Sequence, residues 1–245
     1  MNTQQKVAFI TGGNRGLGLE TARGLGRLGI EVVIGVRDPD KGEEAVAALR
    51  NEGIHASAIG FDATKPSTFQ AVYDHFASQY GRLDILVNNA GIALGEFFAP
   101  NASTVSQDVL RRTFDVNFFA VIELTQILLP LIRQAPAGRI VNLSSILGSL
   151  GTHCAPDSPI APAKEVAYNA SKTALNAYTV HLAAELADTP IKVNSAHPGW
   201  VKTDMGGPNA PMDIADGGKT SVQLATLPAD GPTGGFFHMG EALPW

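Results

Sequence analysis

Cysteine is almost absent from this chain. Among its 245 residues only Cys154 occurs, so no disulfide can form within the molecule. Proteins of oxidising compartments usually carry paired cysteines, and this scarcity therefore favours a reducing compartment. The opening residues, MNTQQKVAFITGG, also lack the charged segment and the apolar core of a secretory signal peptide. We expect a cytoplasmic protein.

An excess of positive charge is missing as well. The chain has 18 lysines and arginines against 23 acidic residues, a net charge of −5, which argues against general nucleic-acid binding. The longest apolar run, residues 117–132, is interrupted by Glu123, Gln126 and Pro130, so we interpret it as a buried helix and not as a membrane span. The six histidines show no metal-binding spacing such as HExxH. We interpret them as surface or core residues and expect no metal.

Short apolar, β-branched segments alternate with longer helical segments. The expected strands are residues 6–11, 31–36, 55–62, 83–91, 138–145, 191–199 and 234–239. The expected helices are one that ends near residue 28 and those at residues 39–53, 66–81, 103–115, 117–134, 165–186 and 213–226. Strands that are apolar on both faces and separated by helices predict an α/β fold. Its doubly wound parallel sheet has about seven strands and helices on both faces. No linker or repeat divides the chain, so residues 1–245 are expected to form one domain.

Glycines cluster in the turn after the first expected strand. The sequence TGGNRGLG, residues 11–18, places Gly12, Gly13, Gly16 and Gly18 between a strand and a helix. Such glycines let the backbone approach a pyrophosphate that faces the helix N-terminus. The spacing departs from the strict GxGxxG pattern, and a plain tight turn is the alternative. The strand–turn–helix context favours nucleotide binding.

The end of the second strand bears on which dinucleotide binds. In NAD-binding folds an acidic residue at this position bonds the ribose 2′-hydroxyl. Here Val36 occupies it, Arg37 follows, and Arg15 lies in the glycine-rich turn. Two guanidinium groups suit a 2′-phosphate, although both could be solvated surface residues, and Asp38 could simply cap the next helix. The paired arginines favour NADP(H).

Further motifs follow in a characteristic order. They are FDAT (61–64), NNAG (88–91), FDVNFFA (114–120), IVNLSS (140–145), YNASK (168–172) and HPGWVKTDM (197–205). With the glycine-rich turn, they make the chain similar to the short-chain dehydrogenases/reductases over nearly its whole length. Residues 231–245 resemble most the NADPH-dependent carbonyl reductases of that family.

The resemblance implies a set of cofactor contacts. Asp62 would contact the adenine, Asn88 and Ala90 would line the ribose, and Val201 and Thr203 would hold the nicotinamide amide. The residues implied to bind NADP(H) are Gly12, Asn14, Arg15, Gly16, Leu17, Gly18, Arg37, Asp62, Ala63, Asn88, Asn89, Ala90, Gly91, Tyr168, Lys172, Pro198, Gly199, Val201 and Thr203.

The resemblance also implies a catalytic tetrad of Asn117, Ser145, Tyr168 and Lys172. Tyr168 and Lys172 stand four residues apart and share a helix face. Taken alone, the two could be an ordinary surface pair. In the tetrad, the cation and an oxidised nicotinamide would lower the pKa of the phenol, and Tyr168 would then protonate a carbonyl oxygen that Ser145 holds. Lys172 would also bind the nicotinamide ribose, and Asn117, at a break between two helices, would anchor a water that relays protons to Lys172.

These residues predict an NADPH-dependent reductase that converts a ketone or aldehyde to an alcohol. A dehydrogenase running oxidatively in a biosynthetic pathway and a catalytically silent NADPH-binding sensor are the alternatives. The expected partner is a small carbonyl or alcohol substrate, with neither nucleic acid nor membrane. Residues 204–219, rich in proline and glycine, are expected to cover the substrate pocket.

Residues 151–166 have the character of an insertion. Ser145 and Tyr168 are 23 positions apart, a longer gap than is usual for the family. Pro156, Pro159 and Pro162 disfavour helix and predict an ordered, extended excursion. A tolerated surface loop is the alternative. The similar carbonyl reductases carry an insertion here and tend to be monomers. We therefore expect the loop to wall the pocket and to favour a monomer or dimer over the usual tetramer.

Overall fold

The computed structural model describes residues 5–245, and its strands form one sheet. The strands are β1 (Val7–Thr11), β2 (Glu31–Val36), β3 (Ala56–Gly60), β4 (Ile85–Asn88), β5 (Arg139–Leu143), β6 (Lys192–Ala196), β7 (Phe236–His238) and β8 (Glu241–Ala242). Their order is β3-β2-β1-β4-β5-β6-β7-β8, and every neighbouring pair is parallel except β7 and β8. The doubly wound α/β fold predicted from the sequence is confirmed, with a two-residue antiparallel strand added at one edge.

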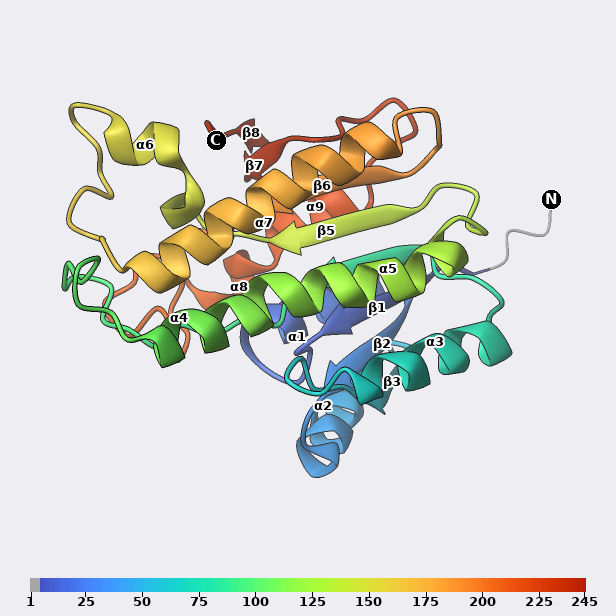
Figure 1. Ribbon diagram of the computed structural model, residues 1–245. Helices are drawn as coiled ribbons and strands as arrows, with labels where there is room; N and C mark the ends of the chain where they lie inside the picture. Colours follow the sequence, from blue (N-terminus) through green and yellow to red (C-terminus); the bar gives the residue numbers. More distant parts are fainter. Residues whose placement is uncertain (1–4) are drawn as a thin grey trace.

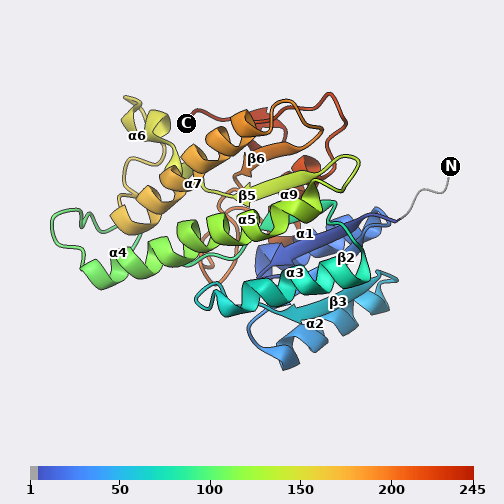
Figure 2. The ribbon, with the colours of Figure 1, turned by 45° about the vertical axis from the view of Figure 1, so that its right-hand side comes forward.

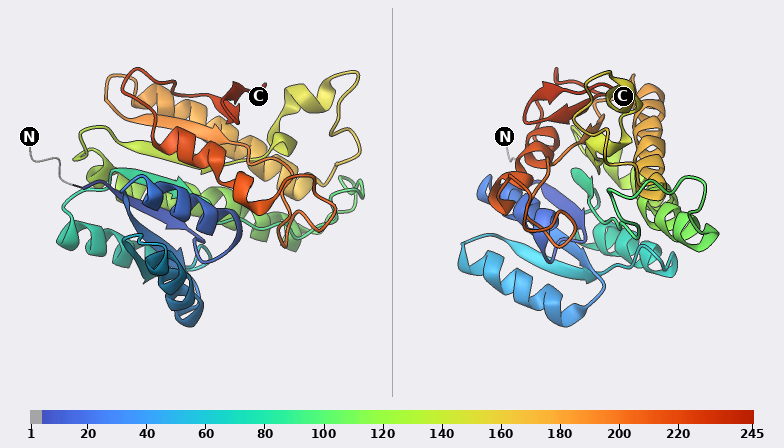
Figure 3. Two further views of the ribbon diagram at one scale, coloured as in Figure 1. Left: turned by 180° about the vertical axis from the view of Figure 1, so that it is seen from behind. Right: turned by 90° about the vertical axis from the view of Figure 1, so that its left-hand side faces the viewer.

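Helices cover both faces of this sheet (Figure 1). They are α1 (Gly16–Arg27), α2 (Pro39–Asn51), α3 (Ser67–Gln79), α4 (Gln107–Phe114), α5 (Ala120–Ile132), α6 (Leu150–Cys154), α7 (Val166–Glu185), α8 (Ile214–Gly217) and α9 (Lys219–Ala225), with a π-helical turn at Asp115–Phe119 and a 3₁₀ turn at Ile146–Gly148. Helices α3, α5 and α7 lie on one face (Figure 2). Helices α1 and α9 lie on the other (Figure 3).

Each face of the sheet has its own apolar core. On one side the rings of Phe9, Phe69 and Phe76 pack with leucines of α5 and α7 such as Leu124 and Leu182. The opposite core joins Ile10 and Ile34 to leucines of α1, α2 and α9, which include Leu25, Leu49 and Leu224. Burial of both sheet faces explains why the strands are apolar throughout and not alternating.

The strand order reverses between β1 and β4, and this reversal positions the site. The chain leaves β1 toward β2 and β3, then crosses back to β4 on the other side of β1. In a parallel sheet of this kind, the loops diverge at such a point and leave a crevice at the carboxyl ends of the strands. The glycine-rich turn after β1 and the NNAG turn after β4 both open onto it.

Helices α4 and α5 form one continuous rod, which corrects the expected break at Asn117. The two are joined by the π-helical turn Asp115–Phe119, whose wider ring is closed by a bond from the N–H of Ala120 to the carbonyl of Asp115. By length and composition alone, the helix Gln107–Ile132 could cross a membrane, because its most apolar 18-residue window has a mean hydropathy of 1.6. Half of that window is buried inside the protein, and this is consistent with the interpretation as a core helix.

The insertion also differs from the expected extended excursion. It begins with helix α6, in which the N–H of Thr152 donates to the capping hydroxyl of Ser149. Turns follow over residues 156–162, where the three prolines stand. The prolines therefore stop the helix after Cys154 and do not prevent it at the start of the segment.

Candidate active site

The glycine-rich turn can accept very little besides glycine. Gly12 and Gly16 have positive φ angles of 65° and 58°. A Cβ on Gly18 would collide with the carbonyl oxygen of Gly12, whereas one on Gly16 would meet nothing within 4 Å. Gly18 is therefore packed against the rest of the turn, whereas Gly16 faces open space toward the crevice. Such a backbone fits a pyrophosphate at the N-terminus of α1.

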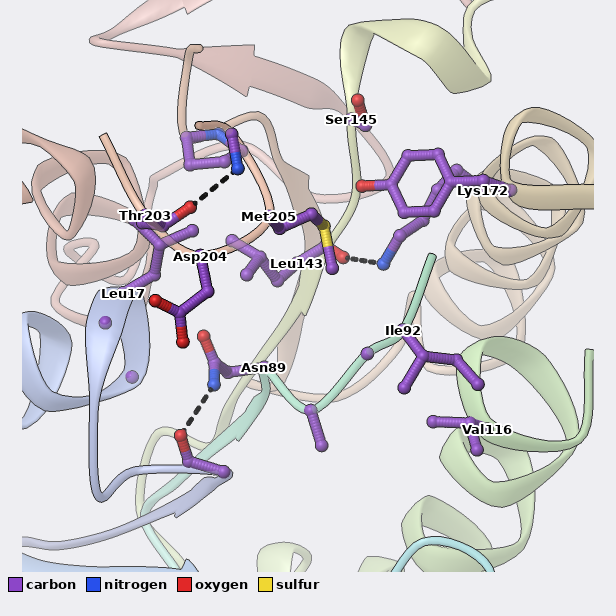
Figure 4. A pocket seen from close by; sticks show the side chains of 18 of the residues that line it. Leu17, Asn89, Ile92, Val116, Leu143, Ser145, Lys172, Thr203, Asp204 and Met205 are labelled. Carbon is purple, nitrogen blue, oxygen red and sulfur yellow. Dashed lines mark hydrogen bonds between the residues drawn. The ribbon is translucent and has the colours of Figure 1, made fainter. Parts of the chain in front are cut away.

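A cleft of about 1630 Å³ begins at this turn and continues to the insertion. Pockets for one small ligand hold about 300–1,000 Å³, so there is room for a dinucleotide and a second molecule. The predicted cofactor residues that line the cleft are Gly12, Asn14, Arg15, Gly16, Leu17, Gly18, Arg37, Asp62, Ala63, Asn89, Ala90, Gly91, Tyr168, Lys172, Pro198, Gly199, Val201 and Thr203. Figure 4 shows Leu17 and Thr203 on one side of the cleft, and Ile92 and Val116 on the other.

Asn88 is the exception, and its predicted ribose contact is not supported. Its side chain is buried, 2% exposed, and donates to Thr125 and Asn142 at 3.1 and 2.9 Å. The next residue, Asn89, takes the place at the cleft, and its amide donates to the carbonyl of Thr11 at 2.7 Å. Neighbouring residues of a strand point to opposite sides, so the motif NNAG supplies one asparagine to the core and one to the cleft.

Both predicted arginines, Arg15 and Arg37, line the cleft. The side chain of Val36 is buried, Arg37 lines the cleft, and Asp38 caps α2 by accepting from Asp40 and Lys41. Asp62 lies nearby, and hydrogen bonds from Thr64 hold the pKa of its carboxyl below the usual value although burial acts to raise it.

A cluster of polar groups lies where β5 and α7 meet. Ser145 lies two residues after the end of β5, and its side chain lines the cleft together with that of Tyr168. Lys172, one turn further along α7, donates to the carbonyl of Leu143 at 2.7 Å (Figure 4). Its ammonium nitrogen stands 5.6 Å from the centre of the Tyr168 ring. A phenol, a hydroxyl and an ammonium thus converge on one end of the cleft.

A family model of short chain dehydrogenases matches residues 6–213. The chain belongs to the short-chain dehydrogenase family. The resemblance noted from the sequence is confirmed, and with it the assignment to the oxidoreductases.

Individual relatives match along their whole length. The chain is 32% identical to carbonyl reductase [NADPH] 1 of Mus musculus, with all of both chains covered. Among solved structures, carbonyl reductase Sniffer of D. melanogaster superposes with a TM-score of 0.83 at 29% identity, covering 99% of this chain and 100% of that one. The NADPH-bound carbonyl reductase from chicken fatty liver gives a TM-score of 0.85 at 25% identity, with the same coverage.

The pKa of the phenol differs from the sequence-based expectation. Tyr168 is 7% exposed, and burial raises its pKa to about 12, against a smaller lowering by the hydrogen bond with Ser145. Burial also lowers the pKa of Lys172 to about 8. The expected fall in the pKa of Tyr168 is therefore wrong for the protein by itself, because desolvation outweighs the lowering by Ser145. At neutral pH the phenol keeps its proton.

Asn117 is fully buried and does not line the cleft. Its side chain binds both backbone groups of Ile92. Oδ1 of Asn117 accepts from the N–H of Ile92 at 2.8 Å, and Nδ2 of Asn117 donates to the carbonyl of Ile92 at 2.9 Å. Nδ2 also donates to Ser171 at 3.0 Å. The π-helical turn thus joins α7 to the loop after β4, and Asn117 has a structural role here whether or not it serves a proton relay.

The far end of the cleft is apolar, and its aromatic residues are not identified from the sequence. Its walls include Phe97 and Phe98 after β4, Trp200 after β6, and Ile160 and Pro162 of the insertion. Met205, Gly206, Gly207, Pro208 and Ile214 of the predicted covering segment also line it. The adjacent Phe97 and Phe98, in a segment where the sequence predicts no helix or strand, could have pointed to this wall.

His197 was interpreted from the sequence as a surface or core residue. In the structure it is buried, and it also lines the cleft. Nδ1 accepts from the N–H groups of Ile146 and Gly199 at 3.2 and 3.4 Å, so the proton of the neutral ring belongs to Nε2. Burial, followed by the neighbouring His238, lowers the pKa of His197 to about 3. The neutral ring ties the chain after Ser145 to the turn after β6. Within residues 5–245, no group of three or more His, Cys, Asp or Glu side chains could hold a metal ion.

Proposed function

We propose that the protein uses NADPH to reduce a ketone or aldehyde to an alcohol. The observation that carries the proposal is the convergence of Tyr168, Ser145 and Lys172 at the end of a cleft that begins at a glycine cradle. The cofactor assignment agrees with the relatives named for NADPH and with Arg37 beside the cleft.

The residues have distinct parts in this reaction. When bound, reduced nicotinamide supplies the hydride that attacks the carbonyl carbon. Tyr168, whose burial keeps it protonated, gives its proton to the carbonyl oxygen, and Ser145 hydrogen-bonds that oxygen and positions it. Lys172 binds the ribose hydroxyls and stabilises the phenolate that remains. A water anchored near Asn117 returns the proton through Lys172.

The apolar end of the cleft supports a bulky, uncharged substrate. Aromatic and aliphatic walls reward the burial of apolar surface, so an uncharged substrate gains more from them than a charged one. Residues 204–219 cover this pocket.

The compartment that we propose is the cytoplasm, because its reducing conditions suit a chain with a single cysteine.

NADPH oxidation tests the function directly. The fall of NADPH absorbance is followed with acetophenone, cyclohexanone and benzaldehyde, and with no carbonyl as control. Turnover that depends on the carbonyl supports the reductase. NADP⁺ reduction by the matching alcohols at neutral pH, faster than the reverse reaction, would favour the oxidative dehydrogenase. Tight NADPH binding with turnover in neither direction would favour the silent sensor.

A monomer or dimer is the assembly that we propose. The insertion packs beside the start of α7, where it would obstruct a tetramer formed through that helix (Figure 1). Light scattering on the purified protein tests this, and a stable tetramer would refute it.

A further inference from the structure

A buried carboxylate stands directly before the catalytic helix. Glu165 is 0% exposed, its Oε1 accepts from the N–H of Ala167 at 3.1 Å, and its Oε2 accepts from the N–H of Tyr168 at 2.6 Å. No ion pair among residues 5–245 includes it. Acidic side chains are almost never buried completely unless their charge is well satisfied. Here two backbone N–H groups satisfy it, and one belongs to the proton donor.

The loop between β4 and α4 packs on the same carboxylate. A Cβ on Gly95 would lie 2.6 Å from Oε1 of Glu165, so only glycine allows the approach. From this loop Asn101 accepts from the N–H of Val166 at 3.2 Å, and the ring of Phe97 meets that of Tyr168 edge-on at 5.2 Å. The first three N–H groups of α7 are therefore all bound, and the pocket wall is seated on the start of the helix.

We propose that Glu165 is a positioning residue for Tyr168. Its carboxylate fixes the backbone of Tyr168, and through Gly95 it also fixes the loop that presses Phe97 against the phenol. The phenol is thereby held beside Ser145. The inference rests on the proposed function, because the position of Tyr168 affects turnover only if Tyr168 protonates the substrate.

Glu165 is the N-cap of α7, and its burial distinguishes it from the exposed caps of α2 and α4. Elsewhere in the fold, Asp38 caps α2 and Ser106 caps α4, and both are short, exposed side chains. Such caps stabilise a helix without the cost of burying a carboxylate. A buried glutamate with one oxygen on each of two successive N–H groups fixes the orientation of the first turn as well as its stability.

The test compares three variants of the full chain. Glu165→Ala removes both contacts, and Glu165→Gln keeps one accepting oxygen but turns an amide nitrogen toward the other N–H. Ser106→Ala is the matched control, because it removes the cap of a helix without a proton donor. For each we would measure kcat and KM for NADPH and acetophenone, NADPH binding by fluorescence, and urea unfolding.

We expect Glu165→Ala to lower kcat by about 10²-fold, as a small misplacement of a reacting group does, and to leave NADPH binding near the wild-type value. The kcat of Glu165→Gln should lie between that of Glu165→Ala and that of the wild type. Ser106→Ala should lose stability and keep its kcat. If Glu165→Ala does not fold, Glu165→Gln takes its place in the test, and a lower kcat with NADPH binding near the wild-type value supports the positioning role.

Two negative results have different meanings. An active wild type together with Glu165 variants that lose stability but keep kcat would overturn the positioning role alone. A wild type that oxidises NADPH with none of the three carbonyls would overturn the proposed function, and the positioning role with it.

Discussion

Arg15 and Asp204 form an ion pair across the mouth of the cofactor cleft, with Nη1 2.5 Å from Oδ2. Arg15 belongs to the glycine-rich turn, and Asp204 to the segment after β6. The two side chains are 69% and 81% exposed, so water and salt screen the pair and it contributes little to stability. Arg37, in contrast, takes part in no ion pair found among residues 5–245, which makes it the arginine most available to a 2′-phosphate.

We predict that NADPH is preferred over NADH and that Arg37→Asp erases or inverts the preference. Loss of a charge-assisted phosphate contact costs on the order of 1.5–3 kcal/mol, and the new carboxylate can instead bond a 2′-hydroxyl. The ratio of kcat/KM for the two cofactors measures this. Arg133→Asp, at the end of α5, is the control. Equal turnover of both cofactors by the unmodified protein would contradict the prediction.

Asp204→Asn should strengthen NADPH binding. The change frees Arg15 from its partner, so its guanidinium can reach the phosphate. The gain should be modest, about 1 kcal/mol or less, because the pair is exposed. The KM for NADPH should fall at low salt and converge with that of the wild type at high salt, while the KM for NADH stays the same. An unchanged KM for NADPH would show that Arg15 does not contact the phosphate.

Tyr168→Phe should abolish nearly all turnover while NADPH still binds. The variant keeps the ring and its contact with Phe97 but has no proton to give. Tyr178→Phe is the matched control, since Tyr178 lies on the same helix and packs against the core. Stopped-flow rates and NADPH fluorescence titration separate the two effects. A near-normal rate for Tyr168→Phe would mean that the proton comes from another group.

Lys172 should make stability rise with pH above about 8. Burial lowers its pKa from 10.5 to about 8, so between these values the unfolded chain binds more protons than the folded protein. Below pH 8 the fold bears the cost of a buried charge, and that cost disappears as the pH rises through this window. Urea unfolding of the wild type and of Lys172→Met at pH 7 and pH 10 measures this effect. Between pH 7 and pH 10, we expect the free energy of unfolding of the wild type to rise by about 2 kcal/mol relative to that of Lys172→Met. Tyr168, Tyr80 and Tyr178 have raised pKa values, which act only above pH 10. A difference independent of pH would contradict the burial argument.

Much of the fold and of the cofactor cleft follows from local sequence. The glycine turn, the apolar strands and the spacing of Tyr168 and Lys172 each record a local requirement. In the structure the strands form where they were expected, and the glycine turn, Tyr168 and Lys172 line one cleft. What was missed depends on tertiary contacts. The pKa of Tyr168 is set by burial, which side-chain spacing does not reveal. The sequence predicts no role for Glu165, because its packing partner Gly95 lies 70 positions away.

The insertion should govern substrate size. His153 holds it in place, since Nε2 donates to the carbonyl of Leu147 at 3.0 Å and Nδ1 accepts from Lys164 at 2.7 Å. Pro159, Ile160 and Pro162 are thereby kept at the pocket wall. Replacement of residues 156–162 by two glycines should raise kcat/KM for bulky aryl ketones relative to cyclohexanone. Unchanged selectivity would return the segment to a passive surface loop.

The π-helical turn at Asp115–Phe119 accommodates one extra residue within a continuous helix. Its ring is closed from residue i to residue i−5, one position more than in an α-helix, so the extra residue is absorbed in this turn and the segments on either side keep their faces toward the core. Deletion of one residue from the turn would restore an ordinary α-helix with α4 still packed on α7. The cost would be local, because the widened turn is what carries the side chain of Asn117 to both backbone groups of Ile92. The turn therefore behaves as a one-residue insertion that the rest of the helix does not register, and its value to the protein lies in the asparagine that it places.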